Sequence, residues 1–332
     1  MSFRSREGSS TALTQHGARE IRIEADFAGQ RLDNHLFRLL RDVPKSRIYR
    51  MLRNGEVRVN GGRVKPDYRV QAGDRVRLPP VRTEPRAARD EAIAPARQRD
   101  LSAAIIHEDP RLLALNKPAG VAVHGGTGVE YGVIEILRAA RPDEPMLELA
   151  HRLDRETSGC LLLARERKAL IALHELLRSH NGIDKRYLAL VNGQWDGERR
   201  RVSSALQRRG PQGQVRRSAS AEDGKLADSE FAPLQRFADA TLMEVRIFTG
   251  RTHQIRVHAA ESGHPILGDD KYGDFAANRK WRKLGLKRMF LHAARMRFTW
   301  PWGGDPIEIH APLPDDLGAV LEHLQTPHES EI

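Results

Sequence analysis

Cysteine is almost absent from this chain of 332 residues, since Cys160 is the only one. A single cysteine excludes an intramolecular disulfide and any zinc site that needs two or more thiolates. Long apolar runs are also absent, because no stretch approaches the roughly 18 apolar residues that a membrane-spanning helix requires. Residues 1–20 lack the apolar core of a secretory signal peptide and are expected to form a disordered tail. We therefore expect a cytoplasmic protein without a membrane anchor.

Acidic residues are in the minority: 44 Asp and Glu oppose 55 Lys and Arg, which gives a formal net charge of +11 and a pI near 10.1. Such a balance favours a polyanionic partner such as nucleic acid. The excess is concentrated, because residues 31–77 hold 13 basic and 5 acidic residues whereas residues 101–332 hold 33 and 31. One small region therefore carries most of the positive charge.

The length favours two domains. Residues 81–100 are rich in proline, alanine and charge without an apolar period, which is typical of a linker. We therefore place a small domain at residues 21–80 and a larger one at residues 101–325. The polar residues that follow are expected to be a frayed end.

The small domain is expected to contain two short helices and a few strands. Apolar residues recur at helical spacing in residues 29–40 and 45–54, Asn60-Gly61 is a hairpin signal, and residues 75–78 alternate as a strand does. In the second helix Arg47, Arg50 and Arg53 share the face opposite the apolar stripe. That face suits a solvated surface or an RNA backbone equally well.

The segment RLDNHLFRLL, followed by PKSRIYRMLRNGEVRVNGGRVKPDYRVQAGDRVRL, resembles an S4-type RNA-binding module over nearly its whole length. The resemblance implies that the two helices and the following turn bind structured RNA.

In the larger domain the segment HRLDRETSG concentrates charge at the entrance to an apolar strand. Asp154 lies between Arg152 and Arg155, and the strand begins at Cys160. Spacing alone favours a surface ion pair beside a turn, because such pairs are common. The other segments of the domain change that interpretation.

Five segments occur in a fixed order: KPAGVAVHGG, HRLDRETSG, IDKRYLALVNG, VRIFTGRTHQIRVHAAESGHPILGDDKYG and KRMFLHAARMRFTWP. Together they resemble the RluA family of RNA pseudouridine synthases, and with the S4-like module the resemblance extends from about residue 21 to about residue 320. It implies an α+β fold in which the catalytic domain is built on a mixed, mainly antiparallel sheet.

The same resemblance assigns roles to individual residues. It makes Asp154 the catalytic carboxylate, Arg251 its cationic partner, and Tyr187 the aromatic residue that stacks on the uracil. It makes Arg152 the residue that fills the gap left by the extruded nucleotide, and it places Leu291 in the wall of the base pocket. Arg256 lies five residues after Arg251, so in a continuous strand it would point to the opposite face.

The implied reaction is the isomerisation of specific uridines to pseudouridine in large-subunit (23S) ribosomal RNA. Two routes are compatible with a catalytic Asp154: addition to the ring at C6, or assistance to glycal formation at the ribose. No cofactor or metal is expected, since nothing is oxidised and no group is imported. The histidines lack the spacing of metal ligands.

The competing hypothesis is a non-catalytic RNA-binding factor of ribosome assembly on the same scaffold. A synthetase that carries an S4 module would need nucleotide-binding signatures that this chain lacks. A monomer is the default expectation. Two basic stretches, Arg199–Arg217 and Arg279–Arg288, suit either solvated loops or arms that follow RNA phosphates.

Overall fold

The computed structural model describes residues 14–16, 18–40, 43, 45–83, 101–125, 131–144, 146–179, 181–208, 215–217 and 225–325. It divides into two compact units, Met1–Gln98 and Arg99–Ile332. Residues 1–13, most of the linker expected at 81–100, and the end from residue 326 lie outside the described residues. Within the ranges given above, no helix is long and apolar enough to cross a membrane.

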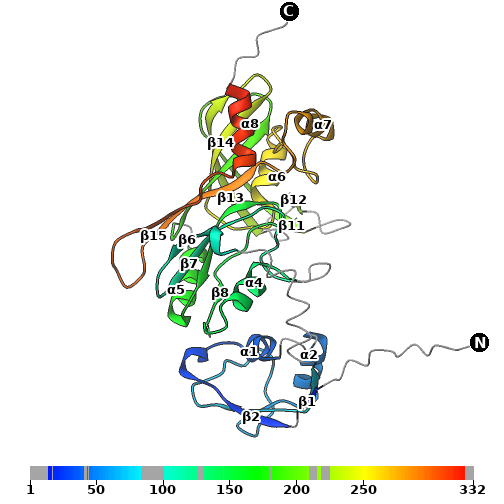
Figure 1. The fold of residues 1–332 in the computed structure, drawn as a ribbon, viewed down its shortest axis with the longest axis vertical. Coiled ribbons are helices and arrows are strands. Elements are labelled where there is room, and N and C mark those ends of the chain that lie inside the picture. Colours follow the sequence, from blue (N-terminus) through cyan, green and yellow to red (C-terminus); the bar gives the residue numbers. More distant parts are fainter. Residues whose placement is uncertain are drawn as a thin grey trace, which may run out of the picture. The chain divides into compact units, whose positions relative to one another are not determined.

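The N-terminal unit contains short strands around two helices (Figure 1). Its elements are β1 (Thr14–His16), β2 (Arg19–Arg22), the 3-10 turn η1 (Ala25–Phe27), α1 (Leu32–Leu39), α2 (Lys45–Arg53), β3 (Arg58–Val59), β4 (Arg75–Leu78) and β5 (Val81–Thr83). Strand β1 pairs with β5, and β2, β4 and β3 form a second small sheet. The expected tail and linker are therefore too long, because β1, β2 and β5 are paired strands.

The core of this unit follows the helical spacing of its apolar residues. Leu32 and Leu36 of α1 and Ile48 and Met51 of α2 are fully buried. Their positions are those that the apolar spacing of the two helices predicts.

The turn at the hairpin signal is confirmed, but the residues after it do not form the second strand of a hairpin. Asn60 and Gly61 both have positive φ, 50° and 79°, as a two-residue hairpin turn requires. The turn closes through a single bridge between Val59 and Gly62, and β3 then pairs with β4 rather than with the residues that follow the turn.

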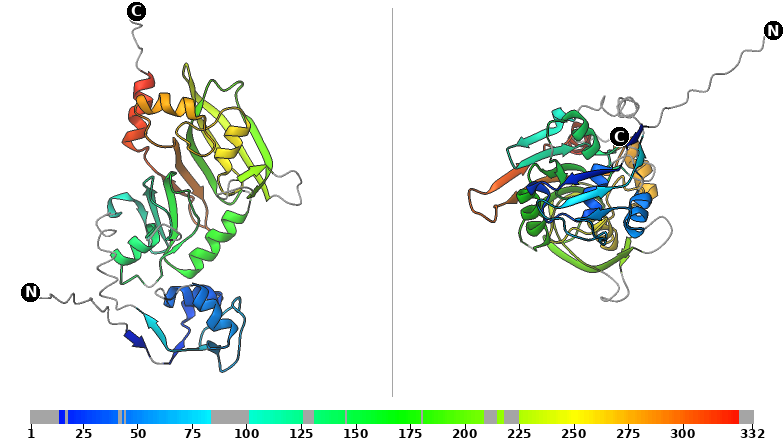
Figure 2. Two further views of the ribbon diagram at one scale, coloured as in Figure 1. Left: turned by 90° about the vertical axis from the view of Figure 1, so that its right-hand side faces the viewer. Right: turned by 90° about the horizontal axis from the view of Figure 1, so that it is seen from below.

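The C-terminal unit is a twisted sheet with helices packed on it (Figures 1 and 2). Its first elements are the turn η2 (Ser102–Ala104), β6 (Ile105–Glu108), β7 (Leu112–Lys117), α4 (Val133–Ala140), β8 (Glu148–Leu149), β9 (Ser158–Ala164), α5 (Arg167–Arg178), β10 (Asp184–Asn192) and β11 (Arg200–Arg208). They are followed by β12 (Val215–Arg217), β13 (Lys225–Arg236), β14 (Ala240–Ile247), α6 (Gln254–Glu261), α7 (Phe275–Lys283), β15 (Leu291–Phe298), β16 (Ile307–His310) and α8 (Asp315–Gln325).

The strand order is β12-β11-β13-β14-β10-β15-β9-β7-β6, with β16 added beside β15 and β8 beside β9. Every one of these pairings is antiparallel except that of β15 with β9, which is parallel and covers only two residue pairs. The mixed, mainly antiparallel sheet confirms the expected fold class. The parallel contact joins two antiparallel halves, so it marks a seam across the sheet.

Gly159 and Ser158 hold this seam together. Gly159 has φ +111°, and a side chain there would collide with the backbone of Ala293 on β15. One residue earlier, the Ser158 hydroxyl bonds Nδ1 of His292 at 3.0 Å, and Nε2 of His292 bonds the carbonyl of Ala311 at 3.0 Å. All of these groups are buried, so the strands that flank the seam are fixed relative to each other.

One core cluster lies where α7 and α8 pack against β10 and β14. Trp281 belongs to this core and is only 3% exposed. The first half of the stretch Arg279–Arg288, up to Lys283, is helix rather than loop, and its tryptophan is not available to stack on a nucleobase. In Arg199–Arg217, β11 and β12 are paired strands, while residues 209–214 lie outside the described residues.

Candidate active site

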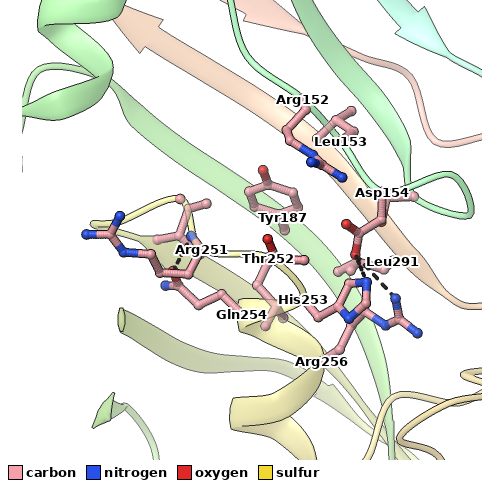
Figure 3. A pocket seen from close by; sticks show the side chains of 14 residues that line it. Arg152, Leu153, Asp154, Tyr187, Arg251, Thr252, His253, Gln254, Arg256 and Leu291 are labelled. Atoms are coloured by element: carbon pink, nitrogen blue, oxygen red, sulfur yellow. Dashed lines mark hydrogen bonds and ion pairs between the residues drawn. The ribbon is translucent and has the colours of Figure 1, made fainter. Parts of the chain in front are cut away.

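A cavity of about 100 Å³ lies at the seam of the sheet (Figure 3). Its walls come from the loop before β9, from β10, from the end of β14 and the start of α6, and from the first residue of β15. The lining residues are Arg152, Leu153, Asp154, Thr157, Tyr187, Ile247, Gly250, Arg251, Thr252, His253, Gln254, Ile255, Arg256 and Leu291. Asp154, Tyr187, Arg152 and Leu291 are thus brought together, as the sequence predicts.

Asp154 is the only carboxylate among these lining residues. It lies in a tight turn, in which the amide of Thr157 donates to the carbonyl of Asp154 at 3.1 Å. Its side chain is 18% exposed, and its Oδ2 is 3.3 Å from Nη1 of Arg256. The carboxylate is therefore accessible from the cavity and held by a cation.

Arg256 is the cation beside Asp154, which corrects the assignment of that role to Arg251. Its guanidinium also donates two bonds of 2.7 Å to the carboxylate of Asp269, whose side chain is fully buried. A bidentate bond of this kind fixes both the position and the orientation of an arginine. Arg256 is therefore held in place before it meets Asp154.

Arg251 is directed away from Asp154 (Figure 3). Its Nε donates to the carbonyl of Leu226 at 3.0 Å, and the residue is exposed. The role that the resemblance assigns to Arg251 therefore falls to Arg256, which would point to the opposite face only if a continuous strand ran through this segment. The chain instead turns after Gly250 and enters α6 at Gln254, so the first turn of that helix points Arg256 at Asp154.

Gln254 shapes this turn, and no pattern in the sequence indicates its role. Its Oε1 accepts from the hydroxyl of Thr249 at 2.7 Å and from the amide of Arg251 at 3.0 Å. Its Nε2 donates to the carbonyl of Asp228 at 2.9 Å and to the hydroxyl of Ser229 at 2.8 Å. All four bonds are buried or partly buried, so this one amide ties the start of α6 to strand β13 and to the turn that follows β14.

Lys117 supports the Asp154 turn from the other side. Its ammonium is fully buried and donates to the carbonyls of Pro118, Val121 and Arg155 at 2.7, 2.9 and 3.1 Å. Burial lowers the pKa of Lys117 to about 7, and nearby carboxylates, that of Asp154 included, oppose the shift. Three carbonyl acceptors match the three donors of an ammonium group. The lysine therefore links the segment after β7 to the turn that carries Asp154.

Tyr187 and Leu291 form the apolar part of the cavity. Tyr187 is 7% exposed and Leu291 is 4% exposed. Burial raises the pKa of Tyr187, so its hydroxyl is protonated at neutral pH. Arg152 is exposed and lies at the rim above Tyr187 (Figure 3). The cavity therefore offers a flat apolar surface, one carboxylate and a cation at its entrance.

Across the part of the chain that the structure describes, no group of three or more His, Cys, Asp or Glu side chains is arranged to hold a metal ion.

Known proteins with the same sequence pattern decide the family. Residues 111–261 match the model of the RNA pseudouridylate synthase family, and residues 30–76 match that of the S4 domain. The chain is 49% identical over 309 residues to the ribosomal large subunit pseudouridine synthase C of Escherichia coli (strain K12), covering 92% of this chain and 96% of that protein. This chain belongs to the RluA family of RNA pseudouridine synthases.

A second relative agrees with this assignment, and two solved structures share the fold. This pseudouridine synthase is 47% identical over 310 residues to the ribosomal large subunit pseudouridine synthase C of Pasteurella multocida (strain Pm70), covering 93% of this chain and 95% of that protein. Human RNA pseudouridylate synthase domain containing 4 superposes with a TM-score of 0.57 at 24% identity, covering 72% of this chain and 98% of that one. Human RNA pseudouridylate synthase domain containing 1 superposes with a TM-score of 0.54 at 25% identity, covering 65% of this chain and 86% of that one.

Proposed function

We propose that this pseudouridine synthase isomerises uridines of large-subunit ribosomal RNA and that Asp154 is its catalytic carboxylate. The proposal rests mainly on the contact between Asp154 and Arg256 in a cavity walled by Tyr187 and Leu291. The relatives named above are synthases of the large ribosomal subunit, which supports this choice of RNA.

The reaction breaks the bond between C1′ and N1, turns the uracil, and joins C1′ to C5. Addition of the carboxylate at C6 and assistance to glycal formation both need an ionised carboxylate next to the nucleotide. The Arg256 guanidinium, 3.3 Å from Oδ2, holds and orients this carboxylate in either route. In both, the proton lost from C5 is balanced by the one gained at N1.

A uridine stacked in RNA cannot reach this site, so the nucleotide has to be extruded. Tyr187 and Leu291 are positioned to contact the faces of the uracil ring. Arg152 at the rim is positioned to occupy the space that the nucleotide leaves in the RNA.

The N-terminal unit supplies further contacts to RNA. Arg50 and Arg53 of α2 are exposed, and no ion pair engages either of them among the described side chains. Arg47 is less available, because its guanidinium is paired with Glu56 at 2.9 Å. We propose that Arg50 and Arg53 contact phosphates, and that the enzyme acts as a monomer in the cytoplasm, where its RNA substrate is made.

The test is tritium release from RNA labelled at C5 of uridine. Asp154→Asn should lower turnover at least ~1000-fold while RNA affinity stays within about threefold, because an essential carboxylate is lost and the shape is kept. Turnover within about tenfold of the wild type would show that another group carries the reaction.

The choice of RNA is tested in cells. Carbodiimide mapping of ribosomal RNA should show large-subunit pseudouridines that vanish when the gene is deleted and return with the wild-type chain. Their failure to return with Asp154→Asn excludes the role of a non-catalytic assembly factor. If no large-subunit pseudouridine vanishes, the substrate assignment is wrong.

A further inference from the structure

His253 is the second group that contacts the Asp154 carboxylate. Its Nε2 is 3.8 Å from Oδ2 of Asp154, an electrostatic contact longer than a hydrogen bond, and Arg256 contacts the same oxygen at 3.3 Å (Figure 3). Both contacts therefore engage one oxygen. The other oxygen, Oδ1, lies on the side of Tyr187, and no described cation or imidazole pairs with it.

The other nitrogen of the same ring is also engaged. Nδ1 of His253 is 2.8 Å from the hydroxyl of Tyr272, a residue outside the cavity wall, and the two rings meet edge to face with centroids 5.5 Å apart. The guanidinium of Arg256 lies over the ring of Tyr272, 5.1 Å from its centroid. Tyr272 thus supports both groups that contact Asp154.

The backbone of His253 is specialised for this position. It has φ 55° and ψ 20°, in the left-handed region, and it directly precedes α6 without giving that helix a side-chain cap. Histidine tolerates this region better than most residues, although the conformation is still uncommon. The chain therefore accepts a less favourable backbone conformation where the ring meets Asp154.

These contacts favour one tautomer of the ring. A carboxylate facing Nε2 favours a proton there, and the hydroxyl of Tyr272 can then donate to Nδ1. Burial lowers the pKa of His253 to about 4, with Asp154 and Asp269 acting against the shift and Arg256 and Lys271 acting with it. The ring is therefore neutral at pH 7.

We infer that His253 is a positioning residue: as the Nε2–H tautomer set by Tyr272, it holds Oδ2 of Asp154 together with Arg256, so that Oδ1 is the oxygen presented to the nucleotide. This inference rests on the proposed role of Asp154. It assigns different tasks to the two carboxylate oxygens and adds two residues to the machinery.

The tautomer can be observed without any reaction. Protein labelled with ¹⁵N-histidine should show His253 as the neutral Nε2–H form at pH 7 in two-bond ¹H–¹⁵N spectra, assigned by the signals that disappear in His253→Asn. An Nδ1–H tautomer, or a protonated ring at pH 7, would overturn the inference whatever the activity of the enzyme.

A matched pair of variants separates the ring nitrogen from the backbone. His253→Gln places an amide N–H near the position of Nε2 but tolerates the left-handed backbone less well, whereas His253→Asn suits that backbone and is too short to reach Asp154. We expect kcat to fall less than about fivefold for Gln and about 10–100-fold for Asn, with KM within about threefold, because misplacing a catalytic group acts on turnover. The reverse order, or equal losses, would contradict a positioning role.

Tyr272→Phe provides a second test, because it removes the hydroxyl that contacts Nδ1 of His253. It should lower kcat to an extent similar to His253→Asn, and combining the two should cost little more, because both remove the same support. Losses that multiply in the double variant would show that Tyr272 acts independently of His253. Asp154→Asn in the same assay keeps the two proposals distinct. If this variant is active, the proposed role of Asp154 is wrong. If it is inactive while His253→Gln and His253→Asn lose equal activity, only the positioning role of His253 is wrong.

Discussion

Arginine has opposite environments in the two units of this protein. In the N-terminal unit Arg50 and Arg53 stand on the outer face of α2, and no described carboxylate forms an ion pair with them. In the catalytic unit Arg256 is buried between two carboxylates, Asp269 and Asp154. A net charge calculated from the sequence counts Arg50, Arg53 and Arg256 equally, as positive charge available to RNA.

The difference shows that the net charge of a region indicates what it can attract, whereas the pairing of each side chain determines what it does. An unpaired surface arginine releases counterions from RNA and adds affinity without reading the sequence. A buried paired arginine adds little to long-range attraction, because its charge is already compensated. Its effect is local, on the carboxylate that it touches.

Among the arginines compared, the largest expected effect comes from replacing, one at a time, the two that flank the start of α6. Arg256→Met should reduce kcat by more than about 100-fold, because Asp154 loses its cation, whereas Arg251→Met should change kcat less than about tenfold. Tritium release at saturating RNA measures both. Equal losses would restore Arg251 as the partner of Asp154.

Folding has to be controlled in this experiment. Removing Arg256 leaves the buried Asp269 without its cation, which typically costs about 3–5 kcal/mol of stability. Arg256→Met combined with Asp269→Asn removes that charge as well and should recover part of the thermal stability without recovering kcat. Recovery of kcat in the double variant would show that the single variant was merely unfolded.

A smaller effect is expected on the N-terminal side of the comparison. Replacing Arg50 and Arg53 by Gln should weaken RNA binding about tenfold and lower the slope of log affinity against log salt by about 0.7 to 0.9 for each phosphate that is no longer neutralised. Arg47→Gln is the matched control on the same helix, and its slope should hardly change because Arg47 is paired with Glu56. Salt titrations of RNA binding by the wild type and by these variants measure the slopes. An equal flattening by Arg47→Gln would remove the distinction between paired and unpaired arginines.

Lowering the pH should destabilise the two units to different extents, because they contain different numbers of histidines whose pKa is lowered by burial. Burial lowers the pKa of His151, His253 and His258 in the catalytic unit, and of His35 in the N-terminal unit, from 6.5 to about 4. A base whose pKa is lowered by folding binds more protons when unfolded, so stability is full above pH 6.5 and falls as the pH drops towards 4. The catalytic unit holds three of these four groups and should lose more stability.

Tryptophan fluorescence reports on the catalytic unit alone, because all four tryptophans follow residue 190. Urea unfolding at pH 7 and at pH 5 should give a clear loss of stability for the wild type. His258→Gln should reduce that loss, by at most about 2 kcal/mol, because one such group has been removed. An identical pH dependence of the two proteins would show that His258 does not contribute.

Most of the architecture follows from sequence because its patterns are local or form a distinctive series of motifs. The helical spacing of apolar residues predicts the burial of Leu32 and Ile48, and the HRLD segment predicts the position of Asp154 in a turn. Tyr187 and Leu291 reach the same cavity as expected, from strands about a hundred residues apart. Only the family motifs indicate that convergence, since no local signal joins such distant segments.

The sequence-based predictions are wrong in segments whose local conformation is decided by tertiary contacts. Helix α6 is buried from Gln254 to Ala259, so it lacks the one-sided apolar stripe that identifies a helix in a sequence. It also starts without a capping side chain, and the left-handed His253 has no sequence signature. The stretch Arg279–Arg288 is a similar case: its charged residues suggest a solvated loop or an arm that follows RNA phosphates, yet Trp281 on α7 lies in the core.

The seam also has a consequence for folding. Ser158 and His292, which bond across it, are 134 residues apart in the chain, and β15 also pairs with β10 over about a hundred residues, whereas the other strands pair with neighbours closer in sequence. Contacts that close long loops tend to form late, because chain entropy is lost before they become favourable. We therefore expect nascent or truncated chains that end before Leu291 to pair much of both halves and still lack an active site. Activity would then be acquired in one late step of synthesis, which restricts modification of RNA to completed enzyme.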